Sequence, residues 1–204
     1  MSTSGVSVLD DPRWAVFNEA GFECSCGQLH VGLFPINMLI PLGWEGASDY
    51  QPDEALTINS TFLSPSYCVW EGEGFALRMR LPLQMRGAAP AAFMYTVWAS
   101  VNRANFEAYI AAKTAGTLDE TKHVPARLSN RLAGHHDTSN LVGFAFEQAD
   151  GGPPLLLLTG PQPYTNRPDH PLIVEQREGI DLNRALDLFA AFGHDMSVAA
   201  AKAA

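Results

Sequence analysis

Basic residues are scarce in this sequence. Lysine and arginine together number 13 among 204 residues, against 22 aspartates and glutamates, so the formal net charge at neutral pH is -9. A surface with this excess of negative charge repels phosphate backbones and anionic lipid headgroups. The composition therefore argues against nucleic acid and membranes as partners, and it leaves an unidentified protein or small molecule.

The sequence also lacks long apolar runs and a framework of paired cysteines. Its apolar stretches, such as residues 155–158, are far shorter than the roughly 20 residues of a membrane-spanning helix. Residues 1–12 contain no basic segment followed by an apolar run and a cleavage site, so we expect no signal peptide. Three cysteines, an odd number, favour a reducing compartment over a disulfide framework. These features predict a cytoplasmic protein.

The glycine patterns of common enzyme sites are missing as well. No glycine-rich turn joins a predicted strand to a helix in the manner of a phosphate-binding loop, and no serine lies in a Gly-x-Ser-x-Gly elbow. Cys68 lies in a strand-like run and has no assigned base. The sequence leaves open whether the protein is an enzyme, but the missing catalytic motifs favour a non-catalytic protein.

The residues that are present predict both strands and helices. Apolar residues make up 47% of the chain, which is enough to form a core. Alternation of apolar side chains predicts a strand over 75–83, and β-branched and aromatic content predicts another over 91–101. Asn102 is a suitable N-cap for an amphipathic helix over 103–115, and Asp181 caps a final helix. Weaker patterns predict a helical turn at 14–20, two β segments around Gly27, irregular structure over 34–65, strands at 126–132, 141–147 and 154–159, and a short helix at 171–177.

The order of these elements suggests an architecture. Mostly adjacent strands joined by short turns, with helices inserted afterwards, predict an α+β fold in which helices pack mainly on one face of an antiparallel sheet. A chain of this length fits a single domain. We expect that domain to span residues 13–195, between a flexible tail at 1–12 and a frayed tail at 196–204.

Four sequence motifs resemble those of a bacterial family catalogued as domain of unknown function (DUF) 2199. The likeness extends from about Gly21 to about Phe192, and it implies one intact domain without an assigned activity. The family's cysteine motif places two residues between its cysteines, whereas here a single residue separates them. The motifs are Phe22-x-Cys24-x-Cys26-Gly27-x-x-His30; Trp98 before Asn105-Phe106; Leu128-Ser129-Asn130-Arg131-Leu132 with Asp137-Thr138-x-Asn140-Leu141; and Asp169-His170-Pro171-Leu172-x-x-Glu175-Gln176-Arg177-Glu178-Gly179-Ile180.

The first motif contains candidate metal ligands. Cys24, Cys26 and His30 offer thiolate and imidazole groups, which suit zinc. Cysteines in zinc knuckles are usually two to four residues apart, and this sequence has no second cysteine pair to complete a site. Cys68 with His123, His135 or His136 would have to supply further ligands. We therefore expect no cofactor: partly buried thiols beside a surface histidine are the favoured interpretation, and a zinc site is the alternative.

The last two motifs are rich in polar side chains. They supply a base, a carboxylate to orient it and a guanidinium to hold an anion, so they could line a ligand-binding site. The same residues could instead close turns, cap a helix or form ion pairs, and the sequence favours that structural role. The candidate ligand-binding residues are Asn130, Arg131, His135, Asp137, Asn140, His170, Glu175, Gln176 and Arg177, with His136 nearby.

Three functional hypotheses remain from the sequence. The absence of catalytic motifs favours a non-catalytic binding module for a protein or small ligand. The cysteines and six histidines support a metal-dependent enzyme of hydrolase type as the alternative. Small size and acidity suggest, at a lower rank, a toxin-neutralising or stress-related partner protein.

Overall fold

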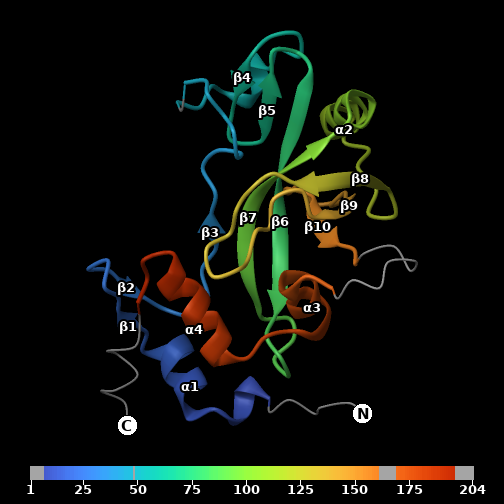
Figure 1. Cartoon of the computed structure of the whole chain (residues 1–204). Helices are drawn as coiled ribbons and strands as arrows, with labels where there is room; N and C mark the ends of the chain where they lie inside the picture. The colour runs from blue at the N-terminus through green and yellow to red at the C-terminus, as the bar shows by residue number, and fades with distance from the viewer. Residues whose placement is uncertain (1–6, 48, 161–168, 196–204) are drawn as a thin grey trace.

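The computed structural model describes residues 7–47, 49–160 and 169–195, and its centre is a long β-hairpin (Figure 1). Strands β6 (Gly74–Gln84) and β7 (Ala92–Val101) pair antiparallel over their whole length, from Phe75 opposite Val101 to Gln84 opposite Ala92. Alternate residues of β6, which include Leu77 and Met79, are fully buried. The strands predicted over 75–83 and 91–101 are thus confirmed.

Three further strands close a barrel on this hairpin. Strands β8 (His123–Leu128), β9 (Val142–Phe146) and β10 (Leu155–Leu158) follow β7 in antiparallel order, and β10 then pairs with β6 in parallel, Leu155 opposite Arg80. Strand β6 has 11 residues and is therefore long enough to pair with two strands along the edge that faces away from β7. It pairs with β5 (Tyr67–Trp70) over one part of this edge and with β10 over the next part. The result is a five-stranded mixed barrel with extra strands at its side.

The predicted antiparallel sheet with helices mainly on one face is therefore wrong. Besides β10, the short strand β3 (Ile36–Asn37) pairs in parallel, with β7, while β4 (Phe62–Leu63) extends the sheet beyond β5. The alternation of side chains tells which face of a strand is buried, but it does not tell which strand lies beside it. No local sequence pattern predicts that β10 pairs with β6.

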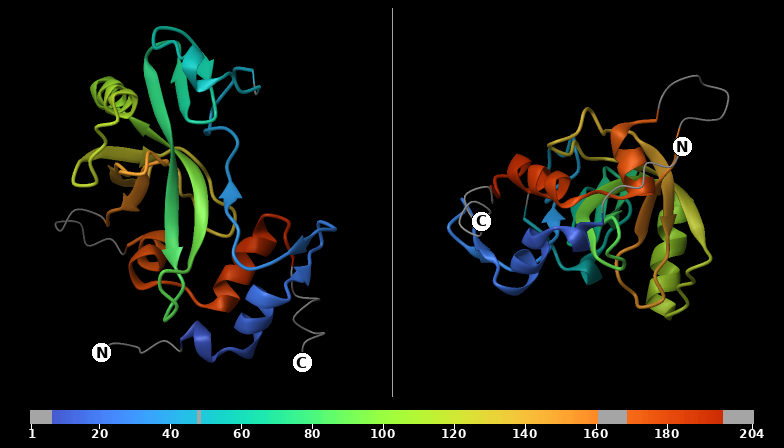
Figure 2. Two further views of the ribbon diagram at one scale, coloured as in Figure 1. Left: turned by 180° about the vertical axis from the view of Figure 1, so that it is seen from behind. Right: turned by 90° about the horizontal axis from the view of Figure 1, so that it is seen from below.

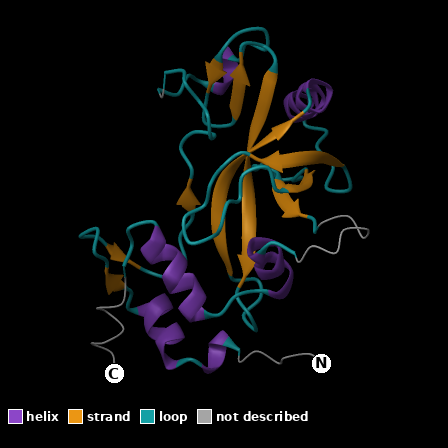
Figure 3. Ribbon diagram, viewed as in Figure 1, coloured by secondary structure: helices purple, strands orange, loops and turns teal. Residues whose placement is uncertain are grey.

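The helices lie at two ends of the barrel instead of on one face (Figures 2 and 3). Helix α2 (Arg103–Ala115) follows β7 and is capped by the Asn102 side chain at one end and by left-handed Gly116 at the other, as predicted. The remaining helices gather at the other end, where β6 and β7 turn. They are the 3₁₀ turn η1 (Val8–Asp10), α1 (Pro12–Glu19), α3 (Pro171–Glu178) and α4 (Leu182–Ala191); a second 3₁₀ turn, η2 (Asp53–Ala55), precedes β4.

A small hairpin at the start of the chain packs beside the end of α4. Its strands are β1 (Phe22–Glu23) and β2 (Leu29–His30), which pair around the turn at Gly27 as the sequence suggested. Phe34, just after the hairpin, stacks on Phe189 of α4 with 4.4 Å between ring centroids. This contact brings two segments together that are about 160 residues apart in sequence, and it creates the setting of the candidate site.

Buried apolar residues form two clusters. The larger fills the barrel and the space beneath the helices, and it includes Val8, which is 2% exposed and lies inside the segment expected as a flexible tail. The smaller lies on the opposite face of β5, β6 and β7. It contains Leu63, Cys68, Ala76 and Trp98, covered by Met38, Trp44, Tyr50 and Trp70. The terminal segments 1–6 and 196–204 fall outside the described residues.

None of the helices in the described part of the chain is both long and apolar enough to traverse a lipid bilayer.

Candidate metal centre

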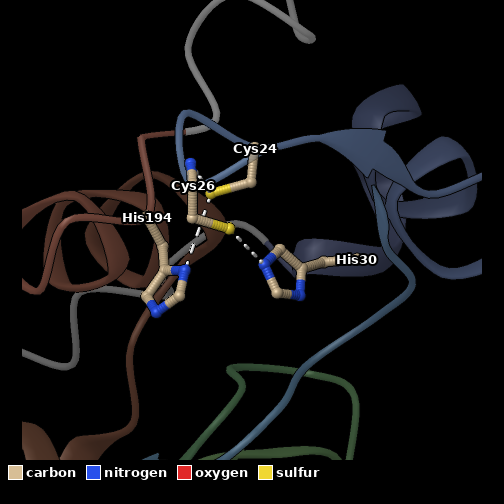
Figure 4. A group of neighbouring side chains, drawn as sticks. All are labelled: Cys24, Cys26, His30 and His194. Atoms are coloured by element: carbon tan, nitrogen blue, oxygen red, sulfur yellow. Dashed lines mark hydrogen bonds between the residues drawn. The ribbon is translucent and has the colours of Figure 1, made fainter. Parts of the chain in front are cut away.

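Four side chains with metal-binding atoms converge between the small hairpin and the end of α4 (Figure 4). Cys24 and Cys26 lie in the turn after β1, His30 ends β2, and His194 follows α4 by three residues. One ligand atom from each of the four lies within 4.8 Å of every other. The cluster thus combines the three predicted candidates with a fourth ligand from the far end of the chain.

The distances within the cluster suit a tetrahedral ion. Cys24 Sγ lies 3.6 Å from His194 Nδ1, and Cys26 Sγ lies 3.3 Å from His30 Nε2. In a tetrahedral zinc site, with Zn–S near 2.3 Å and Zn–N near 2.0 Å, adjacent sulfur and nitrogen ligands are about 3.5 Å apart. Two thiolates and two imidazoles form one of the common ligand sets of structural zinc. Both the geometry and the donor chemistry therefore fit this ion.

The turn itself is shaped to present both sulfur atoms. The N–H of Cys24 donates to the carbonyl of Gln28, and the N–H of Gly27 donates to the carbonyl of Cys24, which closes a tight turn in which Gly27 has a φ of +81°. The N–H of Cys26 points at Cys24 Sγ at 3.4 Å. A thiolate, the form of cysteine that binds metal, can accept such a hydrogen bond. This tight turn brings two cysteines to the cluster although only one residue separates them, a shorter spacing than is usual in zinc knuckles.

Ser25 fastens the turn to the segment that carries His194. Its N–H donates to the carbonyl of Asp195 at 3.2 Å, while its hydroxyl donates to the carbonyl of Gly193 at 3.1 Å. The same hydroxyl accepts from the N–H of Asp195 at 2.9 Å. Three hydrogen bonds, two of them through the Ser25 hydroxyl, thus hold the residues on either side of His194 next to the turn that carries Cys24.

An aromatic side chain orients the two imidazoles. Phe34 stacks on His30 with 4.2 Å between centroids and meets His194 edge-on at 5.1 Å. Burial lowers the pKa of His30, and the neighbouring His194 lowers it further because two imidazolium charges would repel each other. A lower pKa keeps the imidazole neutral, which metal ligation requires.

The sequence did not point to His194. It follows the last amphipathic helix and a glycine, outside every motif, and only the packing of Phe34 on Phe189 brings it to the cysteines. Cys68, considered as a further ligand, is buried in β5 and belongs to the second core cluster. Burial raises the pKa of its thiol to about 12, so it is an inert core residue.

The predicted ligand-binding residues are dispersed in the structure. Asn130 is buried, and its side chain hydrogen-bonds the main chain at Trp98 and Ile40. The side chain of Gln176 accepts from the N–H of Leu158 and donates to the carbonyl of Leu156, so it braces β10. Asn140 occupies an exposed turn with a φ of +66°.

Several of the charged residues pair at the surface. Arg131 lies 3.4 Å from Asp137, with both side chains more than half exposed. Together with His135 they line a cavity of about 480 Å³ in the turn 131–137. Arg177 pairs with Asp169 at 2.5 Å and also contacts Glu178. Of the nine candidates, this surface cavity thus gathers only three.

His135 also belongs to an inner polar network, where it meets Glu175, a further candidate. His135 Nδ1 lies 3.7 Å from Glu175 Oε2 and 3.3 Å from Arg184 Nη2, and its Nε2 lies 3.3 Å from the hydroxyl of Tyr95. Arg184 donates from Nε to Glu175 at 2.7 Å. Burial lowers the pKa of His135 to about 4, with Arg184 and His170 adding to the effect. The network joins α3, α4 and β7, and His170 itself caps α3 through its Nδ1.

Comparison with known proteins adds a family. A family model described as an uncharacterized protein conserved in bacteria matches residues 23–180. The match includes Cys24, Cys26 and His30 and ends before His194. No curated protein and no solved structure matches the chain.

Proposed function

The chain belongs to this family of uncharacterized bacterial proteins, DUF2199, as its motifs indicated, and we propose that it is a non-catalytic binding module held together by one zinc ion. The observation that carries the proposal is the convergence of Cys24, Cys26, His30 and His194 within 4.8 Å. Free thiols in this arrangement suit a reducing compartment, so the proposal includes a cytoplasmic location.

A structural role for the ion follows from the number and origin of the ligands. Four protein ligands complete a tetrahedral shell and leave no position for a substrate or an activated water, whereas catalytic zinc usually has three protein ligands. The ligands also come from two segments more than 160 residues apart. A bound ion would fasten the hairpin β1–β2 to the end of α4, and folding would gain the free energy of metal binding. These points favour a binding module over the metal-dependent hydrolase.

The test is the metal content of the purified protein and its dependence on the fourth ligand. We expect about one zinc per chain, measured by elemental analysis of protein purified without added metal. Substitution by Co²⁺ should give the visible absorption bands of a tetrahedral ion with thiolate ligands. Both signals should fall strongly in His194→Ala and in Cys24→Ser.

The matched control is His136→Ala. His136 is an exposed histidine in the turn 131–137 and is not part of the cluster, so this variant should retain the full zinc content. A zinc content far below one per chain in the wild type, or an equal content in His194→Ala and His136→Ala, would contradict the proposal. A cobalt spectrum typical of an octahedral site would argue against thiolate ligation.

A further inference from the structure

The arginines of this protein fall into two groups. Of the nine in the described residues, seven form ion pairs with carboxylates. Arg127 and Arg78 do not. Arg127 is exposed on β8, where water solvates it, whereas Arg78 is half-buried on β6. A half-buried guanidinium without a carboxylate is unusual, most of all in a chain of net charge -9, because burial of an unpaired charge costs free energy.

Aromatic rings flank the Arg78 guanidinium. Its central carbon lies 5.8 Å from the ring centroid of Tyr50 and 5.9 Å from that of Trp98, which is directly opposite on β7. Cation–π contacts of this kind offset part of the desolvation of the charge. They also hold the planar group in one orientation, so that fewer rotamers are lost when a ligand binds.

The hydrogen-bonding capacity of Arg78 is largely unused. Its Nη1 donates to the hydroxyl of Tyr50 at 3.2 Å and to the carbonyl of Pro65 at 3.5 Å. Its Nε is buried without a hydrogen-bond partner, and Nη2 makes no hydrogen bond within the described residues. The carboxylate of Asp53 accepts instead from the N–H of Ser66. Within the described chain, no anion of the protein satisfies this guanidinium.

Exposed apolar residues lie next to the same rings. The carbonyl of Leu39 accepts from Trp98 Nε1 at 3.2 Å and from the hydroxyl of Tyr50, so this residue is fixed beside both rings. Its side chain is nevertheless 67% exposed, and Leu42 close by in sequence is 48% exposed. A partly desolvated cation and an exposed aliphatic surface therefore lie beside the same two rings, and neither Arg78 nor Leu39 belongs to the candidate metal cluster.

We propose that Arg78 binds the carboxylate of an organic acid whose apolar part packs against Leu39. Arginine matches the planar carboxylate group, and the flanking rings strengthen a charged hydrogen bond by excluding water. A single cation in an acidic protein suits a monoanion better than a phosphate dianion. Two kinds of molecule have this chemistry: a free aliphatic acid, and a peptide whose C-terminal residue is apolar and carries the C-terminal carboxylate. The site goes beyond the zinc-binding role and does not depend on it.

The test is a titration of the full chain with octanoate, followed in ¹H–¹⁵N spectra at the Arg78 Nε–H and Trp98 Nε1–H signals. We expect both signals to shift with octanoate. Acetate, which lacks the apolar part, and 1-octanol, which lacks the charge, should each bind at least about tenfold more weakly. A short peptide with a C-terminal leucine, compared with its C-terminal amide, distinguishes the two sources: the tighter of peptide and octanoate identifies the source.

Variants separate the roles of charge and apolar surface. Arg78→Gln should weaken octanoate binding about tenfold or more, whereas Arg127→Gln, which removes the other unpaired arginine, should leave it within about twofold. Leu39→Ser changes an exposed side chain and should weaken octanoate while leaving acetate unchanged. The proposal is overturned if octanol binds as tightly as octanoate, if inorganic phosphate displaces octanoate at equal concentration, or if Arg127→Gln has the effect of Arg78→Gln. The comparison of octanoate with acetate, octanol and phosphate in the wild type tests the proposal even if Arg78→Gln folds poorly.

Discussion

The side chain of Asn130 joins two segments by accepting a 2.6 Å hydrogen bond from the main-chain N–H of Trp98. Its amide nitrogen donates to the carbonyl of Ile40 at 2.9 Å. One buried side chain thus satisfies a donor on β7 and an acceptor on the segment after β3. The same residue was a candidate ligand-binding group in the sequence, but in the structure its amide points inward and has both partners in the protein.

Replacement of Asn130 by alanine should therefore destabilise the fold. The change leaves the buried N–H of Trp98 without a partner and removes a hydrogen bond from the carbonyl of Ile40, so we expect the free energy of unfolding to fall by about 2–4 kcal/mol. Denaturation by urea measures this loss. Asn37→Ala, at an exposed position on β3, is the control and should change stability by less than about 0.5 kcal/mol. Equal effects of the two substitutions would show that the Asn130 bridge contributes little.

Local features of the fold were predictable from the sequence, and long-range ones were not. The cap at Asn102, the C-terminal Gly116 and the alternation along β6 depend on neighbouring residues, and these elements are confirmed. The parallel pairing of β10 with β6 depends on two segments more than 70 residues apart, and no local pattern encodes it.

The candidate site follows the same division. Cys24, Cys26 and His30 stand in one short motif, so residue chemistry alone was enough to name them. His194 is brought to them by the stacking of Phe34 on Phe189 and by the hydrogen bonds of Ser25. The polar motifs near 130–141 and 169–180 were visible as rich in functional groups, but their partners are mostly main-chain atoms and each other.

Removal of the metal should loosen two distant segments together. If zinc joins the hairpin to residues 193–195, a chelator should lower the midpoint of thermal unfolding in the wild type but not in His194→Ala. Hydrogen exchange should accelerate at the N–H groups of Ser25 and Asp195, which bond across this junction. The amides of β6 and β7 serve as an internal reference and should keep their protection. Uniform acceleration throughout the barrel would instead indicate global unfolding.

The buried imidazole of His135 should make stability depend on pH. Its pKa is lowered to about 4 from the ordinary 6.5, so between these values the unfolded state binds a proton that the folded state does not. The contribution of this imidazole to stability is complete above its pKa in the unfolded state. It is lost as the pH falls through its pKa in the folded state. The groups that face it are Arg184, Glu175, Tyr95 and His170.

The measurement compares wild type with His135→Gln by urea denaturation at several pH values. The stability of the wild type relative to the variant should decrease by about 2 kcal/mol between about pH 7 and about pH 4, a figure reduced from the full shift to allow for solvent screening. His136→Gln, at the exposed neighbouring position, should show no such relative loss. If the difference in free energy of unfolding between wild type and His135→Gln stays constant over this range, the imidazole has the same pKa in the folded and unfolded states.

Gly143 is required where β9 meets β10. A Cβ atom there would lie 2.4 Å from the carbonyl oxygen of Leu157, a main-chain atom fixed by the pairing of the two strands. Gly143→Ala must push the strands apart, and we expect it to lower the free energy of unfolding by about 3 kcal/mol. Gly151→Ala is the matched control, because a Cβ at that position meets nothing within 4 Å and only its φ of +72° opposes the change. That conformational cost is about 1–2 kcal/mol.

Since β10 also closes the barrel on β6, hydrogen exchange at β6 should accelerate in Gly143→Ala and stay slow in Gly151→Ala. Equal exchange in the two variants would show that closure of the barrel does not depend on the close approach of β9 and β10.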